Sequence, residues 1–157
     1  MKENKNLKAI TQIGVVVPDL EAAMEGMRQI FGAEPARFGR TPESNKFYKG
    51  QPGDFAAKMA FYDFANIEIE LVEPQEGDSI WKEFLDSGKC GLHHLRFSVD
   101  SMEDTVKDMC ERGAEVVMEG ESVRQIPGLR WAYFDTEKAL DWTIEVLNEY
   151  QVNPEKN

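Results

Sequence analysis

An internal repeat constrains this chain of 157 residues more than any other feature of its sequence. Residues 12–27, QIGVVVPDLEAAMEGM, align with residues 94–109, HLRFSVDSMEDTVKDM, at an offset of 82 residues (12 to 94). Each copy runs from an alternating segment, through a capping residue, into apolar residues at helical spacing, and the helix pattern then ends at a glycine. The sequence therefore predicts two similar modules.

Strand-like segments follow each of the two predicted helices. They lie at residues 54–65 and 66–74 in the first copy, and at 114–120, 129–136 and 141–149 in the second. The second copy has three such segments after its helix, and we expect the order β-α-β-β-β for each half of the repeat.

We expect one domain over residues 8–150, with module one at about 8–74, a linker with a short helix at 75–90, and module two at about 91–150. Residues 1–7 and 151–157 are polar and are expected to be tails.

Composition excludes several classes of partner. The formal charge of −11 argues against nucleic acid, because proteins that bind a phosphate backbone neutralise it with clustered Lys and Arg. No window of the sequence approaches the length of a membrane span, and the amino terminus lacks an apolar signal region. Cys90 and Cys110 form neither a metal-binding spacing nor a disulfide framework. We therefore expect a cytoplasmic protein with no nucleic-acid or membrane partner.

The predicted strands carry apolar residues on one face and polar residues on the other, because side chains alternate along a strand. The apolar face is expected to pack against the helices. The opposite face carries Gln12 and Gly14, Glu68 and Glu70, His94, Arg96 and Ser98, and Thr143 and Glu145. Buried charges without partners are costly, and a metal ion is one partner for a Gln, a Glu, a His and a Glu.

The paired halves resemble the vicinal oxygen chelate (glyoxalase/bleomycin resistance/dioxygenase) superfamily over about residues 9–149, and within it most closely the methylmalonyl-CoA epimerases. The motifs that carry the resemblance are IGVVVPDLEAA, IELVEP, SIWKEFLDSGKCGLHHLRFSVD with its double histidine, and IEVLNE. The resemblance implies an α+β fold in which two βαβββ modules, as paired half-domains, form a cup-shaped mixed sheet with helices on the outer face. It also implies a homodimer.

In that superfamily each module supplies one metal ligand from its first strand and one from its last. Carried over to this chain, these positions are Gln12 and His94 on the first strands and Glu70 and Glu145 on the last. This donor set suits a divalent ion such as Co, Ni, Mn or Zn. The chain departs from the epimerases at Gln12, where they usually have His, and in lacking the His-Pro that they tend to show before the last strand.

The expected function is a metal-dependent epimerase or racemase that transfers a proton at a carbon α to a carbonyl through a metal-stabilised enolate. The resemblance makes Glu145 a catalytic acid/base and places the opposite carboxylate at Asp54. Arg96 and Lys58 are candidates for binding a carboxylate or phosphate of a small carbonyl substrate such as an acyl-CoA. The alternative for these two cations is an ion pair with Glu68 or Asp54.

Other functions stay open. The ligand set Gln, Glu, His, Glu is also that of one branch of glyoxalase I (lactoylglutathione lyase), which is the second hypothesis. Further alternatives are a racemase of a non-CoA ketone such as an isoflavanone, and a metal-free drug-binding protein. An extradiol dioxygenase is disfavoured, because its iron site needs two histidines and one carboxylate.

Four neighbouring residues receive structural assignments. His93, which points away from His94, is expected to form structural hydrogen bonds. Glu68 and Glu73 are expected to be solvated. Trp81 is expected to pack the short linker helix.

Overall fold

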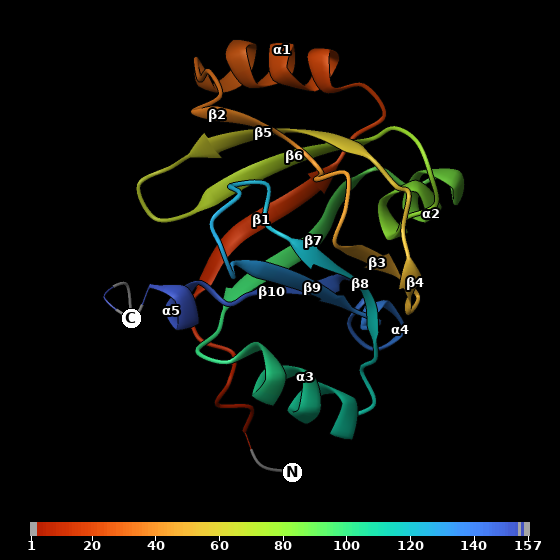
Figure 1. Ribbon diagram of the computed structural model, residues 1–157. Coiled ribbons are helices and arrows are strands. Elements are labelled where there is room, and N and C mark those ends of the chain that lie inside the picture. The colour runs from red at the N-terminus through yellow and green to blue at the C-terminus, as the bar shows by residue number, and fades with distance from the viewer. Residues whose placement is uncertain (1–2, 154, 156–157) are drawn as a thin grey trace.

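The first strands of the two repeats lie side by side at the centre of the structure. In the computed structural model, which describes residues 3–153 and 155, β1 (Ile10–Val16) pairs antiparallel with β7 (Gly91–Ser98) (Figure 1). The two copies of the repeat are therefore joined directly through their first strands.

Each module builds the same arrangement outward from its first strand. In the first module a parallel neighbour is followed by two antiparallel strands: β6 (Glu68–Pro74), β5 (Ala57–Asp63) and β2 (Arg37–Arg40). The second module repeats this order from β7 with β10 (Thr143–Leu147), β9 (Arg130–Phe134) and β8 (Val116–Glu121). The expected α+β fold of two βαβββ modules in one curled mixed sheet is confirmed.

A hairpin that the sequence did not predict extends the edge of the second module. It consists of β3 (Lys46–Tyr48) and β4 (Gln51–Pro52), and β3 pairs antiparallel with β8. Within the described residues the sheet has the order β2-β5-β6-β1-β7-β10-β9-β8-β3-β4. A hairpin from module one therefore forms the edge of the sheet next to β8 of module two.

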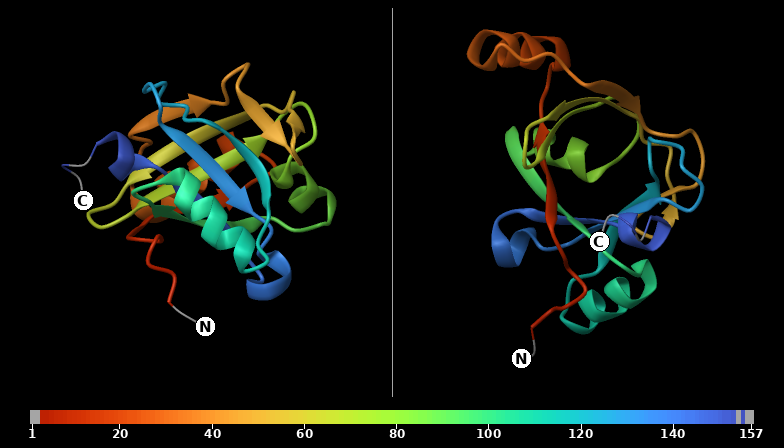
Figure 2. Two further views of the ribbon diagram at one scale, coloured as in Figure 1. Left: turned by 60° about the horizontal axis from the view of Figure 1, so that its bottom comes forward. Right: turned by 90° about the vertical axis from the view of Figure 1, so that its left-hand side faces the viewer.

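Two long helices cover the outer face of the sheet, one on each module (Figure 2). The first, α1 (Leu20–Phe31), begins at Asp19, whose side chain accepts a hydrogen bond from the amide of Ala22, and ends at Gly32 with a φ of 63°. The second, α3 (Met102–Glu111), begins in the same way at Ser101.

The predicted apolar faces of the strands pack beneath these helices. The cluster under α1 includes Val17, Leu20, Met24, Ala60, Tyr62 and Leu71. The cluster under α3 includes Val99, Met102, Met109, Phe134, Ile144 and Val146. Burial of each large side chain contributes roughly 1.5–3 kcal/mol, so these two clusters fix the outer layer.

The short helices form the rest of the chain. The predicted linker helix is present as α2 (Ile80–Asp86), and Ser79 caps its amino terminus by accepting a hydrogen bond from the amide of Lys82. The sequence did not predict α4 (Glu137–Leu140) or α5 (Glu149–Val152), and α5 takes residues 151 and 152 out of the expected carboxyl-terminal tail.

Other parts of the expected tails, residues 1–2, 154 and 156–157, lie outside the described residues. Within the described part of the chain, no helix is both long enough and apolar enough to cross a membrane.

The inner face of the curled sheet is more apolar than the sequence predicted. Trp81 projects from α2 into this interior and meets Phe55, Trp131 and Tyr133, with ring centroids 5.8–6.3 Å apart. The linker helix thus supplies a central side chain of the inner core, which also includes Met59, Phe61, Met118, Leu129 and Leu147. The polar side chains of the inner face are enclosed by this aromatic cluster.

We predict that Trp81→Ala lowers the free energy of unfolding by about 3–5 kcal/mol, because it opens a cavity among packed aromatic rings. Trp81 is only 1% exposed. The control is Phe38→Ala, which removes a side chain that is 65% exposed and should cost less than about 1 kcal/mol. Urea denaturation measures both, and equal losses would contradict the assignment of Trp81 to the core.

Candidate metal centre

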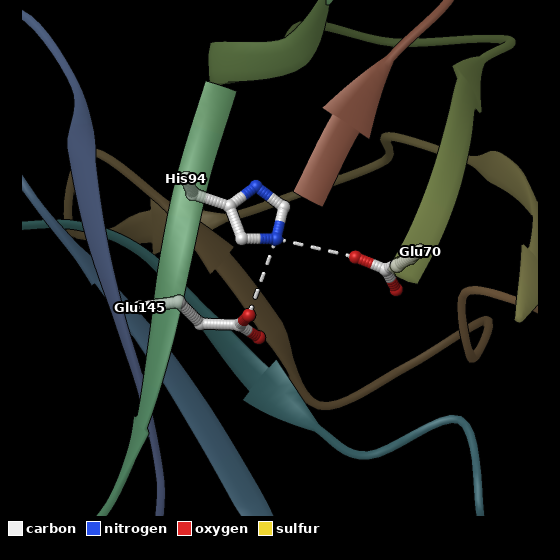
Figure 3. A group of neighbouring side chains, drawn as sticks. All are labelled: Glu70, His94 and Glu145. Carbon is white, nitrogen blue, oxygen red and sulfur yellow. Dashed lines mark ion pairs between the residues drawn. The ribbon is translucent and has the colours of Figure 1, made fainter. Parts of the chain in front are cut away.

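Three side chains meet inside the curled sheet: Glu70 from β6, His94 from β7 and Glu145 from β10 (Figure 3). The Nε2 atom of His94 lies 3.2 Å from Oε2 of Glu70 and 3.3 Å from Oε2 of Glu145. The potential ligand atoms all lie within 4.8 Å of one another. One ring nitrogen therefore faces two carboxylate oxygens that come from different modules.

The register of the central strands produces this meeting. Gly14 lies opposite His94 across the β1–β7 ladder and beside Glu70 across the β1–β6 ladder. A Cβ atom at Gly14 would come within 1.8 Å of the His94 ring, so the imidazole occupies the space that a side chain would fill. On the other side, Glu145 pairs with Arg96, two residues beyond His94 on the same strand. The position of the His94 ring therefore requires glycine at position 14.

Burial and charge oppose each other in this cluster. Burial raises the pKa of Glu70, and the neighbouring His94 offsets the shift only in part. Burial disfavours the charged imidazole of His94, but contacts with Glu145 and Glu70 outweigh it and raise its pKa to about 9. The cluster therefore attracts positive charge.

Gln12, the fourth predicted ligand, is completely buried on the same face of β1 as Gly14. Its amide nitrogen donates a hydrogen bond of 2.6 Å to Oε1 of Glu68, the residue opposite it on β6. Its carbonyl oxygen, Oε1, is buried without a hydrogen-bond partner among the described residues. The acceptor end of this amide is thus free to bind a ligand.

The residues present fit a divalent cation. Oε2 of Glu70 and Oε2 of Glu145 are buried and share Nε2 of His94 as their neighbour, and Oε1 of Gln12 is buried without a hydrogen-bond partner in the described part of the chain. Two carboxylate oxygens lie at one imidazole nitrogen, and the carbonyl of Gln12 is buried on β1, the strand that pairs with the strand of His94; oxygen and nitrogen donors of this kind are preferred by divalent ions. Gln12, Glu70, His94 and Glu145 would hold the ion.

The second histidine of the pair contacts the first. Nδ1 of His93 lies 3.0 Å from Nδ1 of His94, and His93 is 5% exposed. If Nε2 of His94 binds a cation, its Nδ1 carries the proton and donates to His93. Burial and the neighbouring His94 lower the pKa of His93 well below its usual range, which keeps it a neutral acceptor. The predicted hydrogen bond of His93 is present, but the expectation that His93 points away from His94 is wrong, because the two rings are in contact.

A small cavity of about 30 Å³ adjoins the cluster, room for about one water molecule. Glu70 and Glu145 line it together with Tyr133, whose hydroxyl oxygen lies 3.4 Å from Nε2 of His94. Arg37 from β2 and Arg124 from the β8–β9 loop also line it, so cationic groups from both modules surround the cluster.

The other predicted site residues lie differently. Arg96 lines the cavity and is buried, but it forms the alternative ion pair with Glu68 at 3.4 Å. Met59 on β5 lines the cavity. Lys58, the residue before it, is exposed on the other face of the strand, so the expectation that Lys58 faces the site is not met. Asp54 is exposed in the loop before β5 and does not line the cavity.

Two glutamates that were expected to be solvated accept hydrogen bonds from other residues instead. Glu68 accepts hydrogen bonds from Gln12, Arg37 and Arg96. Glu73 accepts a hydrogen bond of 2.7 Å from the amide of Leu20 at the start of α1. Alternation along β6 places Glu68 on the same face as Glu70, and this signal was present in the sequence.

Tyr133 was also missed. It lies opposite Glu145 in the β9–β10 ladder, so its position follows from the pairing of these strands. The period-two pattern of β9 alone could not reveal which strand would lie beside it.

Comparison with known families agrees with this geometry. The model of the Glyoxalase/Bleomycin resistance protein/Dioxygenase superfamily matches residues 11–133, and the chain belongs to this superfamily. The resemblance inferred from the repeat and its motifs is therefore confirmed.

Similar proteins within the superfamily are methylmalonyl-CoA epimerases. The mitochondrial enzyme of Bos taurus is 29% identical over 115 residues, which cover 73% of this chain and 59% of that protein. The chain therefore spans less than two thirds of the length of this relative. Among solved structures, methylmalonyl-CoA epimerase from Mycobacterium tuberculosis has a TM-score of 0.68 at 16% identity, covering 94% of this chain and 91% of that one.

A methylmalonyl-CoA epimerase solved with methylmalonyl-CoA and NH4+ has a TM-score of 0.66 at 22% identity, covering 90% of this chain and 94% of that one. Similarity at these identities shows a shared fold.

We predict that metal binding releases protons near neutral pH. With a pKa of about 9, His94 is protonated at pH 7–8 in the metal-free protein, and a cation must displace that proton. Apparent affinity for Co²⁺ should therefore rise with pH up to about 9. Calorimetry in buffers of different ionisation enthalpy measures the release, and an affinity that is flat between pH 7 and 9 would contradict this picture.

We predict that His93→Leu weakens Co²⁺ binding by about 10–100-fold, because it removes the acceptor that orients His94. His93→Asn, which keeps a short acceptor, should lose less. Competition with a chromophoric chelator measures the dissociation constants. Equal affinities for all three proteins would show that His93 does not orient the ligand.

Proposed function

We propose that this protein is a metal-dependent isomerase that moves the proton on a carbon α to a carbonyl, acting as an epimerase or racemase. The observation that carries the proposal is the convergence of two buried carboxylates, Glu70 and Glu145, on one imidazole nitrogen. Inverting a carbon centre requires proton removal from one face and proton return on the other. Two carboxylates from opposite modules suit that task.

Gln12, Glu70, His94 and Glu145 would hold a divalent ion, which would supply positive charge to stabilise the negative charge left when the α-proton departs. Glu145, as the carboxylate, takes the proton from one face of the substrate carbon, and Glu70, which begins as the carboxylic acid that burial favours by raising its pKa, gives its own proton to the other face. The two residues come from β10 and β6, on opposite sides of His94. Glu70 takes the second role because Asp54, assigned to it by resemblance, lies in an exposed loop outside the cavity.

The surrounding residues control water and charge. Trp81, Trp131 and Tyr133 form an aromatic wall beside the cluster, which excludes water and strengthens electrostatic interactions within it. Arg37 and Arg124 supply positive charge along the same cavity. Each arginine is ion-paired, Arg37 with Glu68 and Arg124 with Glu149 at 3.0 Å, so an anionic substrate would compete with these carboxylates for the two guanidinium groups.

We further propose an acyl-CoA as the substrate, with methylmalonyl-CoA first. Support comes from the names of the relatives and from the complex of a structural neighbour with methylmalonyl-CoA. The cavity of about 30 Å³ is smaller than a thioester carbonyl with its α-carbon, so entry requires displacement of residues that line it. Val123 and Arg124, in the loop between β8 and β9, are lining residues that can move without breaking the central ladder.

We predict that the metal-reconstituted protein exchanges the α-proton of methylmalonyl-CoA with deuterium from solvent, as followed by proton NMR. Glu145→Gln keeps an oxygen ligand but cannot take a proton, and should slow exchange by about 10²–10⁴-fold. The control is Glu119→Gln, which alters an ion pair with Arg130 on the rim of the sheet and should exchange normally. Metal content is measured for each variant.

A parallel sample with methylglyoxal and glutathione tests the second candidate function, which the buried Gln12 and its unpartnered carbonyl oxygen favour. Conversion of the glutathione adduct, with no exchange of methylmalonyl-CoA, would move the protein to the lyase class. Undiminished exchange in Glu145→Gln would contradict the assigned base.

A further inference from the structure

Glu68 is the most heavily contacted acidic residue near the candidate site that the mechanism does not use. Its two carboxylate oxygens accept hydrogen bonds from the amide of Gln12 at 2.6 Å, from Arg96 at 3.4 Å and from the guanidinium of Arg37. Its side chain is 11% exposed. These donors come from β1, β7 and β2, so Glu68 links three strands around the cluster.

We propose that Glu68 is a positioning residue that sets the orientation of the Gln12 amide, so that the carbonyl oxygen and not the NH₂ group serves the metal centre. This role rests on the metal site of the proposed function.

An amide side chain has one end that accepts and one end that donates, and only the oxygen end can bind a cation. Glu70 and Glu145, two carboxylates of the same interior, would attract the NH₂ end of a free glutamine. Glu68, the residue opposite Gln12 on β6, offers that NH₂ group a competing acceptor at 2.6 Å. The carbonyl oxygen is then left buried without a hydrogen bond to any described residue. Such an orientation is costly in an empty site and favourable around a cation.

Two arginines keep Glu68 in place. Arg96, on β7, is buried and also donates a hydrogen bond to the hydroxyl of Thr11 on β1. This second bond fixes the position of the Arg96 guanidinium group. Arg37 lies 3.5 Å above the centroid of the Phe61 ring while it pairs with Glu68. With both cations at its oxygens, the carboxylate is held by groups that are themselves anchored. The orientation of Gln12 is thereby specified before a metal binds.

The test measures Co²⁺ affinity and the visible spectrum of bound Co²⁺, which reports the number and type of ligands independently of turnover. Glu68→Leu removes the acceptor, and affinity should fall by about 10–100-fold with a changed spectrum. Glu68→Gln retains an acceptor of the same shape and should lose less. The matched control, Glu119→Gln, removes a carboxylate of an ion pair far along the sheet and should bind as the unchanged protein does.

A double-mutant cycle separates positioning from general support of the fold. In a Gln12→Leu background there is no amide to orient, so Glu68→Leu should cause no further loss of affinity. Equal losses in the two backgrounds would overturn the proposal, as would unchanged affinity in both Glu68 variants. If the unchanged protein binds no Co²⁺, both the metal centre and the positioning role of Glu68 are contradicted. Absence of turnover with normal Co²⁺ binding would affect the proposed activity alone.

Discussion

The antiparallel pairing of β1 with β7 is the interaction on which the rest of the structure depends. It joins the two modules in one ladder and sets Gly14 against the ring of His94, where any side chain would collide. Parallel pairing of each first strand with the last strand of its own module then brings Glu70 and Glu145 to the two sides of that ring. A shift of one residue in this register would send the cluster to the outer face.

Burying the charged groups of this cluster is energetically costly, and the surrounding fold keeps them buried. Two carboxylates and an imidazole are buried together in an interior walled by Trp81 and Tyr133, and burial raises the pKa of Glu70. The helices on the outer face and the aromatic core prevent the cluster from relaxing into solvent. A cation held by these residues would offset this cost.

The sequence predicted the modules from local periodicity and the repeat, and it predicted the four candidate ligands from the resemblance to the superfamily, which selected them from the larger polar face of the strands. It could not predict the β3–β4 hairpin, which is short and owes its place to pairing with the distant β8. The prediction that Lys58 faces the site failed for another reason. Because β5 has apolar residues on both faces, its pattern does not reveal which face meets the cavity. The partners of Glu68 were hidden because Arg37 lies on a strand with no clear pattern.

The most direct test of the account is a crystal structure of the Co²⁺-loaded protein with diffraction data collected at the cobalt absorption edge. The account predicts one strong anomalous peak per chain, bonded to Oε1 of Gln12, Nε2 of His94 and the carboxylates of Glu70 and Glu145. Distances of about 2.0–2.2 Å are expected for such ligands. A peak at a different place, or none in protein soaked with excess Co²⁺, would contradict the central claim that these residues form a metal centre.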